Sequence, residues 1–392
     1  MNGVGRSGPI GRQPRAAAGR ASEREHWIAL SMVRGIGPVT FWQLLRRHGS
    51  ATDAWRAGPE GLPELRHVTP EAHAALAEQR NGDPRALAAR VAAATARVGA
   101  RLVTALDDAY PKALLNLDPR PPTLSVMGDD AAFEERAVAI VGTRGASGYG
   151  LSVAAEMATD LAEAGVVVVS GLALGIDGAA HRAAVTAGGR SIAVLPSGLD
   201  RVYPPRHRSL AADLLRHGGA LVSEVPVGAE IGKPDFARRN RIIAGLAEAV
   251  VVVEAPDRSG ALLTAAAASA TGRELYAVPG PITAMASRGC NRLIADQQAV
   301  IVTSSGDLLR QIGLARRAQP PAVRALSEME GQVLQRLLER SGSLEELVDR
   351  TRHQPAAVAS ALNLLEARGL VSAFGGATFH PTLSARRLTK VV

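Results

Sequence analysis

AVAIVGTRGASGYG, residues 137–150, is the stretch that decides the fold. Its first five residues are apolar and uncharged, which predicts a short strand buried on both faces of a sheet. A glycine-rich turn follows, and apolar and small residues then recur at helical spacing from Leu151 to Ala164. In such a strand–turn–helix unit, backbone N–H groups and the helix N-terminus face an incoming anion.

The turn carries groups that bind phosphate well. They are the guanidinium of Arg144, the hydroxyls of Thr143 and Ser147, and the unhindered backbone of Gly142. A guanidinium forms charge-assisted hydrogen bonds with phosphate oxygens, and the other groups add donors. We therefore expect a phosphate group to bind at this turn.

A dinucleotide site is the obvious alternative, and the sequence disfavours it. Such sites need G-x-G-x-x-G and an acidic residue about 20 residues further on. Gly148 and Gly150 begin the pattern, but Val153 stands at the third glycine position. The next predicted strand ends in Ser170 and Gly171 rather than in a carboxylate. No Lys-Ser/Thr pair closes the turn either, which excludes a P-loop.

The composition of the 392 residues, 46% hydrophobic and 21% charged, is that of a globular protein of two or three domains. The formal net charge is +8, and a tail without acidic residues supplies half of it through Arg6, Arg12, Arg15 and Arg20. Basicity of this kind supports a polyanionic partner only weakly. Cys290 is the only cysteine, which excludes an internal disulfide and a multi-cysteine metal site.

No targeting or membrane segment is evident in the sequence. No apolar run reaches the roughly 18 residues that a membrane-spanning helix needs, and the N-terminus lacks the apolar core of a secretory signal. We expect a cytoplasmic protein that carries neither a metal nor a cofactor.

The N-terminal region divides into a tail and a helical segment. Residues 1–20 have little to bury and are expected to be disordered. A helical pattern covers residues 21–80, and within it VRGIGP, residues 33–38, resembles the turn of a helix–hairpin–helix. Such a turn either offers backbone N–H groups to a DNA phosphate or only packs a small bundle, and the sequence leaves both roles open.

Apolar strands alternate with helices from residue 81 to residue 312. The expected strands are one that ends at Asp107 and Asp108 before a proline-rich connection, and then 137–141, 166–170, 191–195, 220–223, 249–254, 274–278 and 299–302. This spacing predicts an extended Rossmann-like, doubly wound, mostly parallel sheet. Its ligand crevice is expected at the carboxyl ends of the strands.

The C-terminal region predicts a linker followed by a winged helix. The linker spans residues 313–325, and the winged helix spans residues 326–392. The evidence is helical pattern near 327–340, 343–351 and 354–368, then Leu370-Val371 and Thr378-Phe379 flanking Gly375-Gly376 as a hairpin. The third helix carries Gln354, Ser360, Asn363 and Arg368, so protein contact and nucleic-acid recognition both remain open.

The segment KPDFARRNR, Lys233–Arg241, carries the clearest nucleic-acid signal and is expected to be a loop after the strand at 220–223. Phe236 stands among four basic residues in a chain with only 3% aromatic residues. An aromatic ring can stack on a base while arginines hold phosphates. The alternative is that Phe236 fills the core and the arginines are solvated.

No catalytic constellation emerges from the sequence. Asp177 and His181 are four residues apart at a predicted helix start, but two ligands do not make a metal site, and local capping and packing explain both. Ser197 lacks the G-x-S-x-G context of a nucleophile. Asp107 and Asp108 would point apart in an extended chain.

Five motifs occur in a fixed order: AIVGTRGASGYG, SGLALGIDGAAHRAAVTAGG, AVLPSGLDRVYP, FARRNRIIAGL and AVPGPI. Together they resemble the DNA-processing protein A (DprA/Smf) family of bacteria over roughly residues 101–302. The resemblance implies an extended Rossmann domain that binds single-stranded DNA and forms a homodimer. It also implies delivery of the recombinase RecA onto incoming strands during natural transformation.

The resemblance also implies the site. Its glycine turn, basic loop and arginine-rich stretch are matched by Gly142, Thr143 and Arg144, by Lys233 and Phe236, and by Arg239, Asn240 and Arg241. Ser147, Ser170 and Gly171 complete the candidate DNA-binding residues. Three positions depart from the family pattern: Ala237 replaces a proline, Gln297-Gln298 stands where a glycine is usual, and Leu174 stands where a basic residue is common.

Two functions follow as hypotheses. The first is a non-enzymatic recombination mediator that binds single strands and works with RecA and a second copy of itself. The second is a Rossmann-type hydrolase of a nucleoside phosphate, with Asp177 or Glu254 assisting. The arginines around Phe236 favour the first, because a polymer offers them several phosphates.

Overall fold

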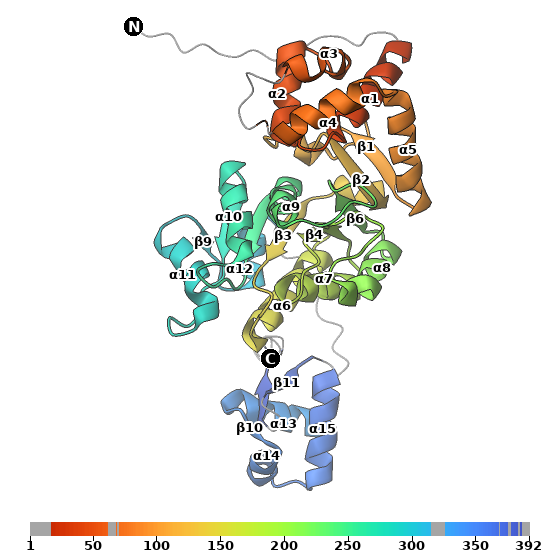
Figure 1. Ribbon diagram of the computed structural model, residues 1–392. Helices are drawn as coiled ribbons and strands as arrows, with labels where there is room; N and C mark the ends of the chain where they lie inside the picture. Colours follow the sequence, from red (N-terminus) through yellow and green to blue (C-terminus); the bar gives the residue numbers. More distant parts are fainter. Residues whose placement is uncertain are drawn as a thin grey trace. The chain divides into compact units, whose positions relative to one another are not determined.

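The structure is a computed structural model, and it describes residues 17–61, 68, 70–314, 326–367, 369–374, 378–382 and 385. The chain divides into two compact units, Met1–Arg316 and Arg317–Val392 (Figure 1). Most of the predicted tail (residues 1–20) and of the predicted linker (residues 313–325) lies outside the described residues. Residues 17–20 are an exception, because they belong to the first helix and not to a disordered tail.

Helices form the N-terminal part of the first unit, as predicted for residues 21–80. They are α1 (Ala17–Ser31), α2 (Pro38–His48), α3 (Ala51–Ala57), the 3₁₀ turn η1 (Gly58–Gly61) and α4 (Pro70–Arg80), and α5 (Pro84–Arg97) follows. Trp27 and Phe41 pack edge to face in their core, with ring centroids 5.0 Å apart. In the turn between α1 and α2, Gly35 has φ +83°, and a Cβ there would lie 2.8 Å from the Cβ of Ala72. The VRGIGP turn is thus packed tightly against α4.

A nine-stranded sheet forms the centre of the first unit in the described residues, in the order β1-β2-β6-β5-β4-β3-β7-β8-β9. The strands are β1 (Arg101–Thr104), β2 (Thr123–Gly128), β3 (Ala137–Val141), β4 (Val167–Ser170), β5 (Ser191–Val194), β6 (Ala220–Ser223), β7 (Ala249–Val252), β8 (Glu274–Ala277) and β9 (Val300–Ile301). Strands β3 to β9 pair in parallel, which confirms the predicted mostly parallel sheet.

Two antiparallel strands at one edge extend the parallel sheet. β2 pairs antiparallel with β6 on one side and with β1 on the other, and the proline-rich sequence around it did not predict a strand. β1 ends at Thr104, three residues before the predicted end, because the backbone turns there and the N–H of Asp107 donates to the carbonyl of Thr104.

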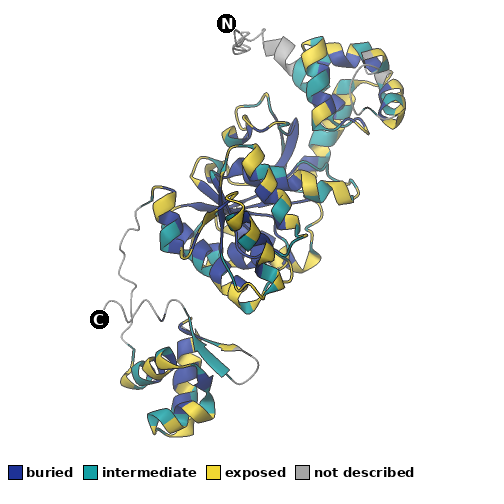
Figure 2. Cartoon of the chain, turned by 90° about the vertical axis from the view of Figure 1, so that its left-hand side faces the viewer, coloured by how far each residue is buried: buried dark blue, intermediate teal, exposed yellow. Residues whose placement is uncertain are grey.

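Helices cover both faces of the sheet. One face packs against α9 (Lys233–Leu246), α10 (Gly260–Ala270) and α11 (Arg288–Ala295), and the other against α6 (Gly148–Glu163), α7 (Ile176–Thr186), α8 (Arg208–Arg216) and α12 (Ser305–Gln311). Short 3₁₀ turns lie in the connections: η2 (Lys112–Leu114), η3 (Asp130–Phe133), η4 (Pro205–His207) and η5 (Met285–Ser287). Figure 2 shows the sheet as the buried middle layer. Successive residues of β3 point to opposite faces: Ala139 lies in one hydrophobic core and Ile140 in the other, as expected for a strand buried on both faces.

The position of β3 in the sheet defines the crevice. β3 has β4 on one side and β7 on the other, although β4 follows it directly in the chain and β7 comes much later. The strand order reverses at this point, and in an open α/β sheet the ligand crevice lies at the carboxyl ends of two such strands.

Helix α9 is the main difference from the predicted secondary structure. The segment Lys233–Arg241 was expected to be a loop, but it forms the first turns of a helix. Pro234 lies in the first turn, and the Gly232 N–H donates to the Asp235 carboxylate at 2.8 Å, which satisfies a free donor at the helix start. Ala237 therefore does not loosen a loop, since it occupies a helical position that alanine favours.

The helical N-terminal part is fixed to the connection between β1 and β2. The indole N–H groups of Trp27 and Trp42 donate to the carbonyls of Pro122 and Arg120, both at 2.8 Å. The Arg24 side chain pairs with the Asp107 carboxylate, also at 2.8 Å. These bonds couple the helices to the sheet edge that carries β2.

The second unit has the element order of a winged helix, as predicted. Its elements are α13 (Glu328–Glu339), β10 (Gly342–Ser343), α14 (Leu344–Thr351), α15 (Pro355–Ala367), β11 (Val371–Phe374) and β12 (Thr378–Pro381). The strands form an antiparallel sheet in the order β10-β12-β11. The hairpin glycines and Arg368 lie outside the described residues, and α15 itself carries no lysine or arginine.

Candidate nucleic-acid interface

The glycine turn after β3 lies at the predicted crevice between the loops that follow β4 and β7. The N–H of Thr143 donates to the carbonyl of Glu254 at 2.7 Å. A Cβ at position 142 would collide with the side chain of Ile176 and crowd the carbonyl of Glu254, so only glycine fits beside the start of α7. The turn is thus fixed between two neighbouring loops.

The Glu254 side chain holds the other end of the same turn. Its buried carboxylate accepts hydrogen bonds from the hydroxyl of Ser147 at 2.5 Å and from the N–H of Ser147 at 2.9 Å. The Ser147 oxygen also accepts from the N–H of Gly150 and caps α6. A carboxylate therefore occupies the N-terminal end of α6, where a phosphate would otherwise be favoured. This differs from the prediction that Ser147 contacts phosphate, because its donors are already used.

Arg144 and Phe236 meet across the crevice. Arg144 is exposed, and its guanidinium carbon lies 5.2 Å from the centroid of the Phe236 ring. The Tyr203 ring packs edge to face against Phe236, with centroids 5.6 Å apart. Lys233, the first residue of α9, is exposed. Exposed cations beside aromatic rings are the combination by which proteins bind single-stranded nucleic acids.

A pocket of about 420 Å³ opens at this place, between the glycine turn, α9 and α10. Its lining includes six residues of the predicted set, Gly142, Thr143, Arg144, Phe236, Arg239 and Asn240. Arg258 and Leu263, which sequence reasoning missed, line it as well. Asn240 is buried, and its amide N–H donates to the carbonyl of Gly260 at 3.2 Å, which ties α9 to α10. Arg258 follows β7, so its place after a parallel strand is the sequence signal that could have identified it.

Arg239 is a structural cation and not an exposed phosphate ligand. Only 7% of the residue is exposed, and its guanidinium donates to the carbonyls of Gly171 and Val194 and to the side chain of Asn240. Burial lowers the pKa of Arg239 to about 10, while the Asp177 carboxylate acts in the opposite direction. The prediction placed Arg239 on phosphate because a sequence does not show which arginine of a cluster turns inward.

The loop after β4 serves the same internal network. The Ser170 hydroxyl donates to the carbonyl of Ile140 at 2.6 Å, and the Gly171 N–H donates to the Asp177 carboxylate at 3.1 Å. A Cβ at position 171 would collide with the guanidinium of Arg239. Ser170 and Gly171, both predicted as phosphate contacts, are instead buried parts of the scaffold under the crevice.

Arg241 is also paired inside the protein. Its guanidinium lies 2.6 Å from both carboxylate oxygens of Glu224 and 2.6 Å from the carbonyl of Pro119, and its side chain is only 15% exposed. Burial raises the pKa of Glu224, and the adjacent Arg241 opposes this shift. The predicted phosphate contact of Arg241 is therefore not seen as an exposed cation in the structure, because an internal carboxylate already neutralises this side chain.

Asp177 and His181, four residues apart at the start of α7, hold the loop before that helix. The Asp177 carboxylate accepts from the N–H groups of Gly171 and Ala173, and the two His181 ring nitrogens bond to the Leu172 N–H and the Ser191 hydroxyl. Burial lowers the pKa of His181 to about 3 and raises the pKa of Asp177. In the described ranges no three His, Cys, Asp or Glu side chains gather closely enough to hold a metal ion.

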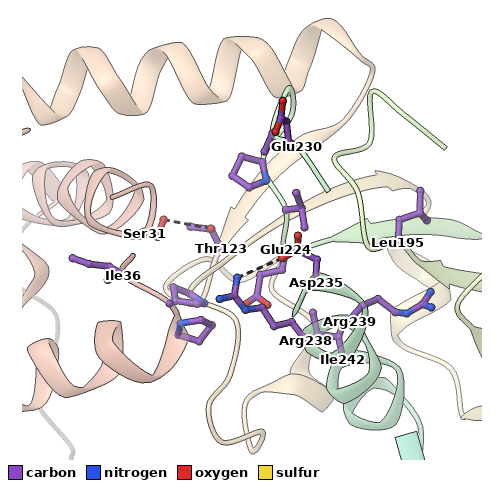
Figure 3. Close-up of a pocket in the computed structure, with 16 residues that line it drawn as sticks. Ser31, Ile36, Thr123, Leu195, Glu224, Glu230, Asp235, Arg238, Arg239 and Ile242 are labelled. Atoms are coloured by element: carbon purple, nitrogen blue, oxygen red, sulfur yellow. Dashed lines mark hydrogen bonds and ion pairs between the residues drawn. The ribbon is translucent and has the colours of Figure 1, made fainter. Parts of the chain in front are cut away.

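A second pocket, of about 320 Å³, lies on the other side of α9, beside the turn between α1 and α2 (Figure 3). Asp235, Arg238 and Ile242 of α9 point toward it, whereas Phe236 and Asn240 line the first pocket. The lining carries three carboxylates, those of Glu224, Glu230 and Asp235. Arg238 lies 3.4 Å from Asp235, so this pocket is less suited to phosphate than the first.

The geometry agrees with the comparison to protein families. Residues 101–313 match the family described as DNA recombination-mediator protein A, and residues 21–80 match the DprA-like N-terminal HHH domain. The chain belongs to the DNA recombination-mediator protein A family. The resemblance inferred from the motifs is therefore confirmed. No helix in the described parts of this family member has the length and apolar character that a membrane crossing requires.

Individual relatives support the family assignment. The chain is 42% identical over 301 residues to a relative from Mycobacterium tuberculosis, covering 71% of this chain and 77% of that one. It is 44% identical over 221 residues to the protein Smf of Escherichia coli, covering 56% and 59%. The solved structure of DNA processing protein A from Streptococcus pneumoniae is similar with a TM-score of 0.62 at 31% identity, covering 74% of this chain and 97% of that one.

Proposed function

We propose that this protein binds single-stranded DNA without sequence preference at the crevice between the glycine turn and α9, as a recombination mediator of its family. The observation that carries the proposal is the approach of the Arg144 guanidinium to the Phe236 ring at the carboxyl ends of the strands. Arg144 and Lys233 neutralise phosphates, Gly142 and Thr143 line the phosphate position, and Asn240 lies at the pocket wall. A cytoplasmic location, expected from the sequence, is part of the proposal.

An unpaired strand fits this crevice better than a duplex. The faces of bases are covered by their neighbours in a duplex, whereas an unstacked base can place its face on an aromatic ring. Phe236 is partly exposed, and Tyr203 beside it is 38% exposed. The two rings therefore offer a platform that needs no base pairing.

Binding, and not hydrolysis, is the activity that the side chains support. The hydrolase alternative required Asp177 or Glu254 to assist a reaction. Both carboxylates are buried and accept hydrogen bonds from the loops that frame the crevice. Glu254 does not line the pocket, and the carboxylate of Asp177, which does, is shared with the backbone N–H groups of its own loop.

Fluorescence titration of an oligothymidylate across salt concentrations tests the proposal. Arg144→Ala should weaken binding and reduce the slope of log affinity against log salt by about 0.7, the value for one phosphate on a single strand. Arg90→Ala, on the exposed face of α5, is the matched control and should change neither. An Arg144→Ala titration that overlays the wild type would reject the assignment.

Incubation with nucleotides, followed by analysis for released base or phosphate, tests the hydrolase alternative.

Delivery of RecA and pairing with a second copy complete the proposal. At one end of the sheet in the described residues, β9 pairs only with β8, and Val300 and Ile301 are 53% and 44% exposed. An open edge with exposed branched side chains suits the same edge of a second copy. Ile301→Lys should give monomers in sedimentation experiments, whereas Ile282→Lys, at an exposed residue outside the strand, should not.

RecA assembly on a labelled single strand should be faster with the wild type than with Arg144→Ala.

A further inference from the structure

The pocket between α9 and α10 has a second wall that the predicted site did not include. Arg258 is exposed on this wall, and the neighbouring carboxylate of Asp257 pairs at 2.9 Å with Arg292 instead. Among the described residues, no carboxylate lies within ion-pair distance of Arg258. The pocket therefore has an exposed arginine on each side, Arg144 on the glycine turn and Arg258 before α10.

An apolar surface adjoins Arg258. Leu263 lies in the second turn of α10 and is 54% exposed, although it lines the pocket. Ile243, Pro256 and Ala261 line the same pocket. An exposed leucine gains nothing from a phosphate, but it gains from contact with the flat apolar face of a base. The wall thus combines the two kinds of contact that a nucleotide offers.

We propose that Arg258 and Leu263 form the second half of the DNA site, with Arg258 on a further phosphate and Leu263 on the face of a base. The proposal rests on the proposed function and extends it. The volume of about 420 Å³ lies at the lower end of the roughly 300–1,000 Å³ typical of small-ligand pockets. The pocket therefore takes one nucleotide of the strand, held between the wall of α9 and the wall of α10.

The first turn of α10 also favours a phosphate near Arg258 and a base near Leu263. The helix begins at Gly260, and the Ser259 hydroxyl caps it by accepting from the N–H of Ala261 at 3.3 Å. The positive end of the helix dipole thus lies next to Arg258. Both favour an anion at this end of the wall, with the apolar surface of Leu263 one turn further along.

Two variants measured on two ligands test the two contacts separately. The variants are Arg258→Gln and Leu263→Ala, with Arg90→Gln as the control that removes an exposed charge from α5, outside the pocket lining. The ligands are an oligothymidylate and an abasic oligomer of the same length. Both substituted side chains are exposed, and unchanged thermal unfolding would verify that the variants fold.

Arg258→Gln should reduce the slope of log affinity against log salt by about 0.7 on both ligands. When the salt concentration rises from 50 to 200 mM, the loss of affinity should therefore be about 2.5-fold smaller for the variant than for the wild type. Leu263→Ala should leave the slope unchanged and weaken binding of oligothymidylate severalfold, with no effect on the abasic oligomer. A slope for Arg258→Gln equal to that of Arg90→Gln, or equal effects of Leu263→Ala on both ligands, would overturn the inference. The proposed function fails separately, if the wild type does not bind oligothymidylate or Arg144→Ala binds it equally well.

Discussion

The Arg144 guanidinium carbon lies 5.2 Å from the centroid of the Phe236 ring, although three strands of the sheet separate the two residues in the chain. Arg144 follows β3, and Phe236 lies in the first turns of α9, which returns the chain from β6 to β7. The parallel topology brings both residues to the carboxyl ends of the strands, beside the point where the strand order reverses. The fold thus places the cation and the aromatic ring next to each other.

The Phe236 ring should contribute to DNA affinity as a stacking surface. Phe236→Leu keeps an apolar side chain but removes the aromatic face, and we expect it to cost about 1–3 kcal/mol of binding free energy. Phe236→Tyr keeps the face and should retain most of the affinity. Titration of an oligothymidylate measures both. Equal affinities for the leucine and tyrosine variants would show that aromatic stacking plays no part.

Arg239 and Arg238 are adjacent in sequence and should behave in opposite ways. Arg239→Met leaves the buried Asp177 carboxylate without its cation and two carbonyls without their donor, so the free energy of unfolding should fall by about 3–5 kcal/mol. Arg238 has a side chain that is 54% exposed, and Arg238→Met should change stability by less than about 0.5 kcal/mol. Chemical denaturation measures both values. Similar losses for the two variants would contradict the structural role of Arg239.

The contrast between these arginines shows what the sequence could and could not predict. The parallel strands were predictable because both of their faces are buried, so that each is a short apolar run. The glycine turn and Phe236 were predictable as a pair because both lie at carboxyl ends of the sheet. The partners of Arg239 and Arg241 were not, because the carbonyl of Val194 and the carboxylate of Glu224 come near only in the folded chain. Helix α9 was not predicted because its run of basic residues indicated a loop, although Pro234 and Asp235 are typical of the first turn of a helix.

Glu254 should stabilise the glycine turn that carries Arg144. Glu254→Gln removes the charge from the acceptor of the two Ser147 bonds, and hydrogen bonds to a charged group contribute about 1.5–3 kcal/mol each. We expect a lower free energy of unfolding and weaker binding of oligothymidylate, because the turn becomes less well fixed. Glu230→Gln, at an exposed carboxylate of the other pocket, is the control for both measurements. A Glu254→Gln variant with wild-type stability would show that the carboxylate does not fix the turn.

Gln297 occupies a conformation that suits glycine, as the family pattern suggests. Its φ is +55°, in the left-handed region that costs a residue with a side chain about 1–2 kcal/mol. Gln297→Gly should raise the free energy of unfolding by about 0.5–1 kcal/mol, after the greater freedom of glycine in the unfolded chain is subtracted. Gln298→Gly, at a neighbour without a positive φ, should lower it by a similar amount. Thermal unfolding of the two variants should therefore shift in opposite directions, and a shift in the same direction would refute the assignment of strain.

His181 should make the first unit sensitive to acid. Burial, together with the electrostatic effect of the nearby His207, Arg239 and Arg182 side chains, holds its pKa at about 3 in the folded protein, below its ordinary value of 6.5. Between these two values the unfolded chain binds a proton that the folded chain does not, so the free energy of unfolding falls as the pH falls. The slope is about 1.4 kcal/mol per pH unit.

His181→Gln removes this contribution. The variant should be less stable than the wild type at pH 7, because it loses the bonds to Leu172 and Ser191, but its stability should fall less steeply between pH 6.5 and pH 3. Asp177, whose pKa is raised by burial, titrates in both proteins, so the difference between the two curves isolates His181. His217→Gln, at an exposed histidine of the same unit, is the matched control and should run parallel to the wild type. Denaturation curves for His181→Gln that also run parallel to the wild type would mean that His181 is protonated in the folded protein, and that the bonds at its ring nitrogens do not hold it neutral.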